Sequence, residues 1–412
     1  MKPGPLNWLA TSPPQARKAL FAASLGWMLD SFDVMLYSLV LASLIVDLHL
    51  SKSTAGILGS ITLLAAAAGG MIFGVLADRF GRTRALMASV LIYAVFTAAC
   101  GLAQNVVQLA VFRILLGFGM GGEWASGASL VSESFPIEHR GKALGLMQSA
   151  WAIGYALAAL VVAVVLPRFG WRAVFFVGIL PAFFTLWIRR SVEEPASFEK
   201  ARLIPNQSGT FATLFRKPLV ILTIGLTAMN ACCLFGWWGF NLWVPAYLAL
   251  PAAKGGIGLT GHVMTAIVVF MQVGMWLGYV TFGYISDYFG QVRTYTAYLL
   301  AAAMLMLLFG ATRSPVVLFF LAPFVAFAAT GYFSGFAAVT ADVYESRIRA
   351  TAQGFTYNTG RIASAAAPFI VGSLADKRGF GAAFLVSSGA FLLAALLIWA
   401  LGQRLRVAQP RY

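Results

Sequence analysis

Five charged residues lie inside long apolar stretches of the sequence: Asp30, Asp33, Arg113, Glu123 and Arg361. If these stretches cross a membrane, each charge costs roughly 2.5 kcal/mol or more, so each needs a partner or a function. Carboxylates at such depths can take up and release protons, and a guanidinium can bind another carboxylate through two hydrogen bonds. The five residues therefore point to the movement of protons or of an anion.

The composition predicts that these stretches cross a membrane. Of the 412 residues, 60% are hydrophobic and 10% are charged, and the mean hydropathy is +0.82. A soluble fold cannot bury that much apolar surface. A membrane helix needs about 20 apolar residues, and the sequence offers twelve such segments. They cover 19–46, 54–77, 85–103, 106–132, 143–166, 171–188, 218–248, 261–285, 294–311, 315–341, 350–375 and 382–401. We therefore expect an all-α membrane protein with twelve transmembrane helices.

The Lys and Arg residues are distributed unevenly over the loops. Most of the 29 lie in the loops on the same side of the membrane as the N-terminus. Because positive loops stay in the cytoplasm, we expect both termini there, in a multi-pass protein of the cytoplasmic (inner) membrane. The net charge of +15 then reflects orientation, which argues against nucleic acid as a partner.

Two charged stretches occur twice in the chain. Gly74–Arg84 reads GVLADRFGRTR and returns 209 residues later as GYISDYFGQVR at Gly283–Arg293. Glu133 and Arg140 return at the same offset as Asp342 and Arg349. Two landmarks with one offset indicate a duplication. The expected domains are an N-terminal six-helix half (1–188), a cytoplasmic linker (189–217) and a C-terminal six-helix half (218–412).

The repeated loop resembles the motif G-x-L-A-D-R-x-G-R-R that follows helix two in the major facilitator superfamily. Arg113–Gly121 matches the superfamily pattern R-x-x-x-G-x-G-x-G of helix four, and the resemblance covers the whole chain. The continuation GGEW and the segment Trp27–Asp33 are similar to the metabolite and organic-acid proton symporters, including sialate and monocarboxylate permeases. Sugar and betaine importers carry overlapping signatures. The resemblance implies two pseudo-symmetric bundles that work by alternating access.

The repeated loops are expected to close the cytoplasmic side. The resemblance implies that Asp78 approaches the start of helix eleven and Asp287 the start of helix five, where each carboxylate would meet a positive helix terminus. The alternative is that the loops only set the topology. The other charged residues expected to pair near this surface are Arg79, Arg82, Arg84, Arg293, Glu133, Arg140, Asp342 and Arg349.

The charged residues inside the predicted membrane helices are assigned to two roles, proton coupling and substrate binding. We expect Asp33 to couple protons through a contact with Arg113 that forms and breaks during transport. Asp30 competes for this role, and Glu123 is a further candidate for proton coupling. Arg361 is expected to bind a substrate carboxylate, and a permanent ion pair with Asp30 or Glu123 is the alternative. Further candidate substrate contacts are Asn358, Tyr357, Asn241, Trp238, Gln148, Trp151 and Gln272.

The leading hypothesis is a secondary transporter that moves a small carboxylate with protons. The alternatives are a proton-coupled sugar or zwitterion importer and a drug-efflux antiporter. An enzyme or receptor is disfavoured because the sequence has no recognisable pairing of nucleophile and base, metal-ligand cluster or nucleotide loop. We expect no cofactor and no metal. The expected partners are the substrate, protons and the lipid bilayer, and the protein is expected to be a monomer.

Overall fold

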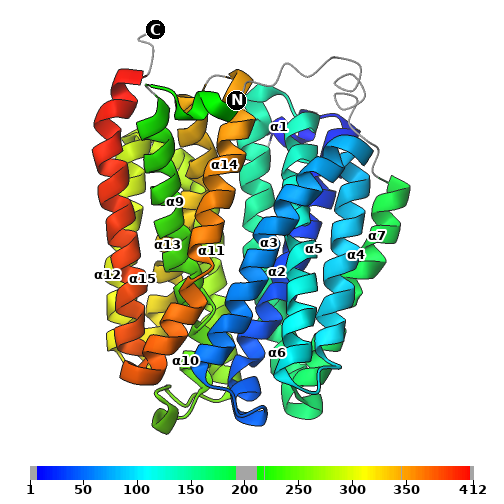
Figure 1. Ribbon diagram of the computed structural model, residues 1–412, viewed down its shortest axis with the longest axis vertical. Coiled ribbons are helices and arrows are strands. Elements are labelled where there is room, and N and C mark those ends of the chain that lie inside the picture. Colours follow the sequence, from blue (N-terminus) through cyan, green and yellow to red (C-terminus); the bar gives the residue numbers. More distant parts are fainter. Residues whose placement is uncertain (1–6, 192–210, 218, 345, 409–412) are drawn as a thin grey trace.

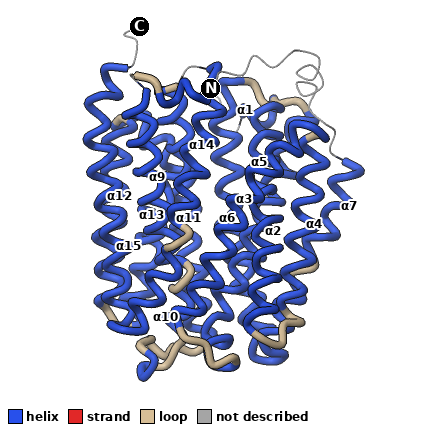
Figure 2. Tube along the Cα trace, in the orientation of Figure 1, coloured by secondary structure: helices blue, strands red, loops and turns tan. Residues whose placement is uncertain are grey.

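The structure is a computed structural model that describes residues 7–191, 211–217, 219–344 and 346–408. Every regular element in these residues is a helix, as predicted (Figure 2). In order they are α1 (Asn7–Thr11), α2 (Pro14–Asp47), α3 (Lys52–Phe80), α4 (Arg82–Cys100), α5 (Val106–Ser134), α6 (Ile137–Val177), α7 (Leu180–Ser191), η1 (Phe211–Phe215), α9 (Leu219–Asn241), α10 (Val244–Ala249), η2 (Ala252–Lys254), α11 (Gly261–Phe289), α12 (Gln291–Ala311), α13 (Pro315–Val343), α14 (Ser346–Ser364) and α15 (Ala367–Ala408). Most of the predicted linker falls on residues 192–210, outside the described residues.

The described chain contains 10 apolar spans long enough to cross a membrane. Two of them, His139–Thr185 and Ala352–Gly402, have 47 and 51 residues, more than twice the roughly 20 that one crossing needs. The first turns back at Gly170 (φ 74°) and the second at Gly379 (φ 80°), a backbone conformation that glycine adopts without steric cost. Counting each of these two as a pair of crossings gives the twelve that the sequence predicts.

Two predicted helices are interrupted in the middle of the bundle. The segment predicted as 218–248 divides into α9 and α10 after Asn241, and the segment predicted as 350–375 divides into α14 and α15 after Ser364. Proline follows each interruption, at Pro245 and Pro368, and proline cannot donate a helical hydrogen bond. Asn241 and Arg361 therefore lie beside irregular backbone, which membrane proteins tolerate where it is buried or lines a cavity.

The helices form two groups that lie side by side (Figure 1). α2 to α7 make one group and α9 to α15 the other, and both termini lie at the same end of the molecule. Small residues allow the helices to approach closely. A Cβ atom on Gly121 of α5 would lie 2.5 Å from the backbone nitrogen of Gly70 on α3. This face of α3 therefore packs against protein.

The two groups are joined at the end opposite the termini (Figure 1). Asp376 of α15 accepts hydrogen bonds from the backbone N–H groups of Lys52 (3.2 Å) and Ser53 (2.8 Å) at the start of α3. The Lys52 ammonium also lies 3.6 Å from Asp376 Oδ1. Deeper in the bundle, Ser60 Oγ accepts a hydrogen bond from the Phe369 N–H (3.3 Å). The structure is thus closed at this end.

Candidate substrate and proton site

Three buried acids come from two helices of the first group. Asp30 and Asp33 lie on α2 and Glu123 lies on α5, and their exposed fractions are 0%, 1% and 0%. Within the described chain, none of their carboxylate oxygens has a hydrogen-bond partner. An unpaired carboxylate ion inside a membrane protein costs several kcal/mol. A bound proton would remove that charge, so these acids are suited to carry protons.

Glu123 lies against α2 one helical turn from Asp30. Gly26 leaves the space for it, because a Cβ atom there would lie 2.6 Å from Glu123 Oε1. Gly26 and Asp30 are four residues apart and therefore share a face of α2. The charges of Asp30 and Glu123 interact, and they repel each other when both acids are ionised. The two acids can therefore act as a pair that holds one proton.

Arg361 approaches this acid pair from the second group of helices. It is 3% exposed and lies three residues before the end of α14. Its charge acts on Asp30, yet its guanidinium forms no salt bridge with any acid in the described ranges. The permanent ion pair of Arg361 with Asp30 or Glu123 is therefore absent from this conformation. A buried cation without an anion in contact can accept one from a ligand.

Asn358 and Tyr357 precede Arg361 on α14. Asn358 Nδ2 donates to the Gly354 carbonyl (3.0 Å), and its Oδ1 would lie 3.5 Å from a Cβ atom on Gly70 of α3. Tyr357 lies within electrostatic reach of Arg361 and Asp30. Asn358 thus faces the boundary between the two groups of helices, whereas the Tyr357 ring lies 6.2 Å from that of Phe336 on α13.

A row of indole rings crosses the same boundary. The Trp27 and Trp151 ring centroids are 4.6 Å apart, and those of Trp151 and Trp238 are 6.2 Å apart in an edge-to-face arrangement. The rings come from α2, α6 and α9. Trp151 and Trp238 are predicted from the sequence, whereas Trp27 is not predicted as a site residue. Its spacing of three residues from Asp30 is the signal that could have indicated it.

Three side-chain amides each have a buried carbonyl oxygen without a partner in the described residues. Asn241 Nδ2 contacts the sulfur of Met35 at 3.5 Å, and Gln272 Nε2 donates to the Val268 carbonyl (3.1 Å). The third amide is Gln148. Such acceptors are rare in folded interiors, so hydrogen-bond donors of a ligand or water could complete them.

The predicted contact between Asp33 and Arg113 is not formed in this conformation. The Arg113 guanidinium stacks 3.6 Å from the centre of the Tyr37 ring, and its Nε donates to the Leu58 carbonyl (3.2 Å). Its Nη1 has no partner in the described chain. Because the hypothesis has this contact break and re-form, it stays a prediction about another state of the protein.

The described gating candidates lie at helix ends: Glu133 in the last turn of α5, Arg140 in the first turn of α6, Asp287 in the last turn of α11 and Arg293 in the first turn of α12. Asp287 is exposed in the last turn of α11 and forms no salt bridge with a described residue; its predicted contact with the start of α6 stays a prediction. Arg293 is exposed, Glu133 is half-buried, and Arg140 donates to the Phe135 carbonyl (3.2 Å). Arg84 is among the described residues, whereas the side chains of Asp78, Arg79, Arg82, Asp342 and Arg349 lie outside them.

Comparison with known proteins identifies the family. The sequence profile described as Major Facilitator Superfamily matches residues 23–251 and 247–411, which is nearly the whole chain. The chain belongs to the major facilitator superfamily. It is therefore a multi-pass membrane transporter for a small molecule, and the family consists of transporters rather than enzymes.

Several transport proteins are similar to this chain over nearly their full length. The chain is 32% identical to a "Probable 4-methylmuconolactone transporter" of Cupriavidus pinatubonensis, covering 94% of this chain and 90% of that protein. It is 31% identical to the cis,cis-muconate transport protein of Acinetobacter baylyi (92% of each). It is 30% identical to the sialic acid transporter NanX of Escherichia coli (96% of each). These relatives agree with the predicted resemblance to metabolite and organic-acid transporters.

A solved structure supports the fold. The inward open conformation of the xylose transporter XylE from E. coli matches with a TM-score of 0.75, covering 93% of this chain and 96% of that chain. The identity is 20%, so the match bears on the fold alone. The predicted architecture of a major facilitator is thus confirmed.

Proposed function

We propose that this transporter imports a small organic acid together with protons. The observation that supports the proposal is Arg361, a buried guanidinium that forms no salt bridge with an acid of the described residues and whose charge acts on Asp30 of the acid pair. The proposal places the protein in the cytoplasmic (inner) membrane with both termini in the cytoplasm. The loop charges support this orientation, and both termini lie at one end (Figure 1).

The substrate end of the site is built around Arg361. A guanidinium can hold a carboxylate through two parallel hydrogen bonds, and Asn358 offers a polar contact one turn away. The indoles of Trp27, Trp151 and Trp238 present flat apolar faces on which a conjugated or ring-shaped substrate would stack. The named substrates of two relatives, cis,cis-muconate and sialic acid, are acids. We therefore infer that the substrate has a carboxylate and an apolar or ring-shaped body.

The acid pair provides a reason for proton coupling. A substrate carboxylate bound to Arg361 would approach Asp30, and two like charges 4 Å apart repel by about 4 kcal/mol at an effective dielectric constant of about 20. A proton on the pair would remove this repulsion. Substrate binding and proton binding would then favour each other. We accordingly assign the coupling proton to Asp30 and Glu123, with Asp33 as the alternative position.

Transport would proceed by rocking of the halves 1–188 and 218–412, joined by the linker 189–217, around the site between them. The contact of Asp376 with the start of α3 closes the end opposite the termini, which is the outer end in the proposed orientation. Opening to the outside requires this contact to break. The repeated loops would meet when the cytoplasmic side closes. Each monomer contains a complete site in this proposal.

Uptake into proteoliposomes tests the proposed function. A panel of labelled organic acids, sugars and zwitterions, including cis,cis-muconate, is offered with and without an inward proton gradient. We expect acids to accumulate only with the gradient, and Arg361→Gln to lower their uptake at least about tenfold, because a hydrogen-bonded charge pair is lost. Arg313→Gln, an exposed site at the end of α12, is the matched control. Accumulation of neutral sugars alone would contradict a carboxylate substrate. Export of substrate driven by an inward proton gradient would contradict import.

A further inference from the structure

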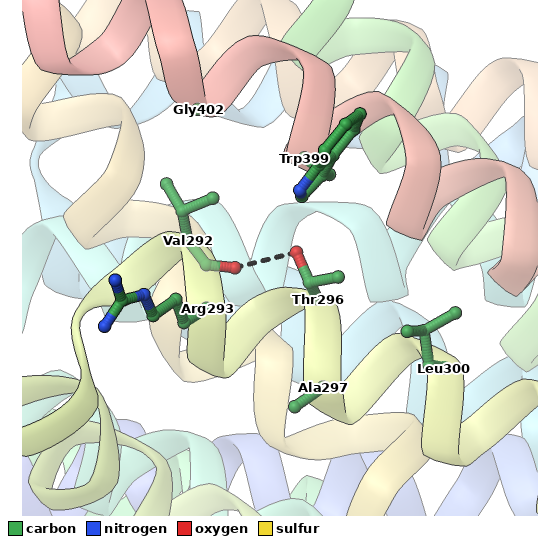
Figure 3. A pocket seen from close by; sticks show the side chains of 7 residues that line it. All are labelled: Val292, Arg293, Thr296, Ala297, Leu300, Trp399 and Gly402. Carbon is green, nitrogen blue, oxygen red and sulfur yellow. Dashed lines mark hydrogen bonds between the residues drawn. The ribbon is translucent and has the colours of Figure 1, made fainter.

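A groove on the outer surface of the second helix group lies between α12 and α15. It has a volume of about 440 Å³ and is lined by five residues of α12 and two of α15: Val292, Arg293, Thr296, Ala297, Leu300, Trp399 and Gly402. Figure 3 shows Trp399 across the groove from Val292, with its indole nitrogen directed toward α12. We propose that this groove binds one anionic phospholipid.

The groove opens where lipid surrounds the protein. Trp399 is 62% exposed, Leu300 is 44% exposed and Met304, one turn further along α12, is 66% exposed. Large apolar side chains exposed on a membrane helix meet acyl chains. At one end of the groove α12 and α15 touch: a Cβ atom on Gly402 would lie 2.6 Å from Val292 Cγ1. An acyl chain can therefore enter along Leu300 and Met304 and end at this crossing.

The crossing carries positive charge without a compensating acid. Arg293 is exposed and forms no salt bridge in the described ranges, even with Asp287, which lies six residues earlier. None of the seven lining residues is acidic. Just after Gly402 the sequence continues with Arg404 and Arg406 and contains no acid up to Tyr412. Residues 403–412 carry three Arg and no Asp or Glu, so their side chains supply no acid for Arg293, whereas an anionic headgroup fits.

The hydrogen-bond donors fit a phospholipid headgroup. The Trp399 indole N–H has no acceptor within the described chain, while the Thr296 hydroxyl already donates to the Val292 carbonyl (2.8 Å; Figure 3). A phosphate can accept from the Arg293 guanidinium, and Trp side chains favour the level of the headgroups. With the proposed orientation, this end of α12 faces the cytoplasmic leaflet, whose anionic lipids attract basic residues.

Lipid titration of the purified full-length transporter tests the proposal without depending on transport. Phosphatidylglycerol and phosphatidylcholine are each added to protein in detergent, and bound lipid is counted by native mass spectrometry. We expect one phosphatidylglycerol to be retained in preference to phosphatidylcholine. Arg293→Gln should weaken phosphatidylglycerol binding about fivefold, because one basic residue near an anionic membrane surface contributes about 1 kcal/mol. Arg313→Gln removes the same charge just beyond the other end of α12 and should leave retention unchanged.

Three results would overturn the proposal. Equal retention of the two lipids, or equal effects of Arg293→Gln and Arg313→Gln, would show that the groove does not select an anionic headgroup. Trp399→Leu keeps an apolar side chain but removes the indole donor, so unchanged phosphatidylglycerol retention by this variant would remove Trp399 from the site. Cross-linking of Leu300→Cys to a second copy, regardless of added lipid, would assign the groove to a dimer contact. Gel filtration establishes that each variant is folded.

Discussion

Replacing Asp376 should open the outer end of the transporter. The carboxylate accepts from two backbone N–H groups at the start of α3, at 3.2 and 2.8 Å, and lies 3.6 Å from the Lys52 ammonium. This contact joins the two groups of helices and can exist only while the outer end is closed. The contact therefore stabilises only the state in which the outer end is closed. Removing the contact should raise the population of the open state.

The contributions at Asp376 can be estimated separately. Loss of the hydrogen bonds from the two backbone N–H groups costs about 1 kcal/mol, and loss of the negative charge at a helix N-terminus costs about 0.3–1 kcal/mol. The ion pair with Lys52 is partly exposed, with 11% and 32% of the two side chains accessible, and such a pair adds about 0–1 kcal/mol. Asp376→Ala should thus shift the equilibrium by about 2 kcal/mol, or roughly 30-fold. Asp376→Asn retains an acceptor and should shift it by about 1 kcal/mol, roughly fivefold.

Distance measurements between spin labels at Arg168→Cys and Arg378→Cys report this shift. Both positions are exposed at the outer end, one in each group of helices. Asp47→Ala is the matched control, because Asp47 accepts from Trp171 Nε1 (2.8 Å) within the first group alone. It removes a comparable contact that both states share. If Asp376→Ala left the label distances as unchanged as Asp47→Ala, the reasoning that this contact holds the outer end closed would be refuted.

Three further predictions concern the coupling site, the helix packing and the cytoplasmic side. Asp30→Asn should exchange labelled for unlabelled substrate yet fail to concentrate it in a proton gradient, because Asn mimics a permanently protonated acid; normal accumulation here, with its loss in Asp33→Asn, would return the coupling role to Asp33. Gly70→Leu should reduce the yield of folded protein in gel filtration, since even a Cβ atom there would lie 3.3 Å from the Gly121 carbonyl oxygen; wild-type yield would contradict this packing. Asp78→Asn should lower substrate uptake while membrane insertion stays intact, and unchanged uptake would restrict the repeated loop to a topological role.

Much of the architecture follows from the sequence because a membrane limits the possible structures. Spanning segments must satisfy their own backbone hydrogen bonds, so apolar length alone predicts helices and their number. The turns within the two longest apolar spans fall where the predicted helices end, and each contains a glycine at positive φ, Gly170 and Gly379. The duplication was visible as a constant offset between charged landmarks. The breaks after Asn241 and Ser364 were not predicted, because the apolar pattern continues across them.

The charged residues show where sequence reasoning ends. Apolar context and position along a helix predicted that Asp30, Asp33, Glu123 and Arg361 lie deep in the membrane, since 1.5 Å of rise per residue fixes depth. Several groups share that depth, and sequence spacing says nothing about which helices meet. The packing of small residues decides which helices meet: the absence of a side chain at Gly26 leaves room for Glu123 beside α2. The tertiary structure therefore brings Asp30 toward Glu123 and Arg361, because contacts across helices depend on their relative rotation and distance, which close packing alone determines.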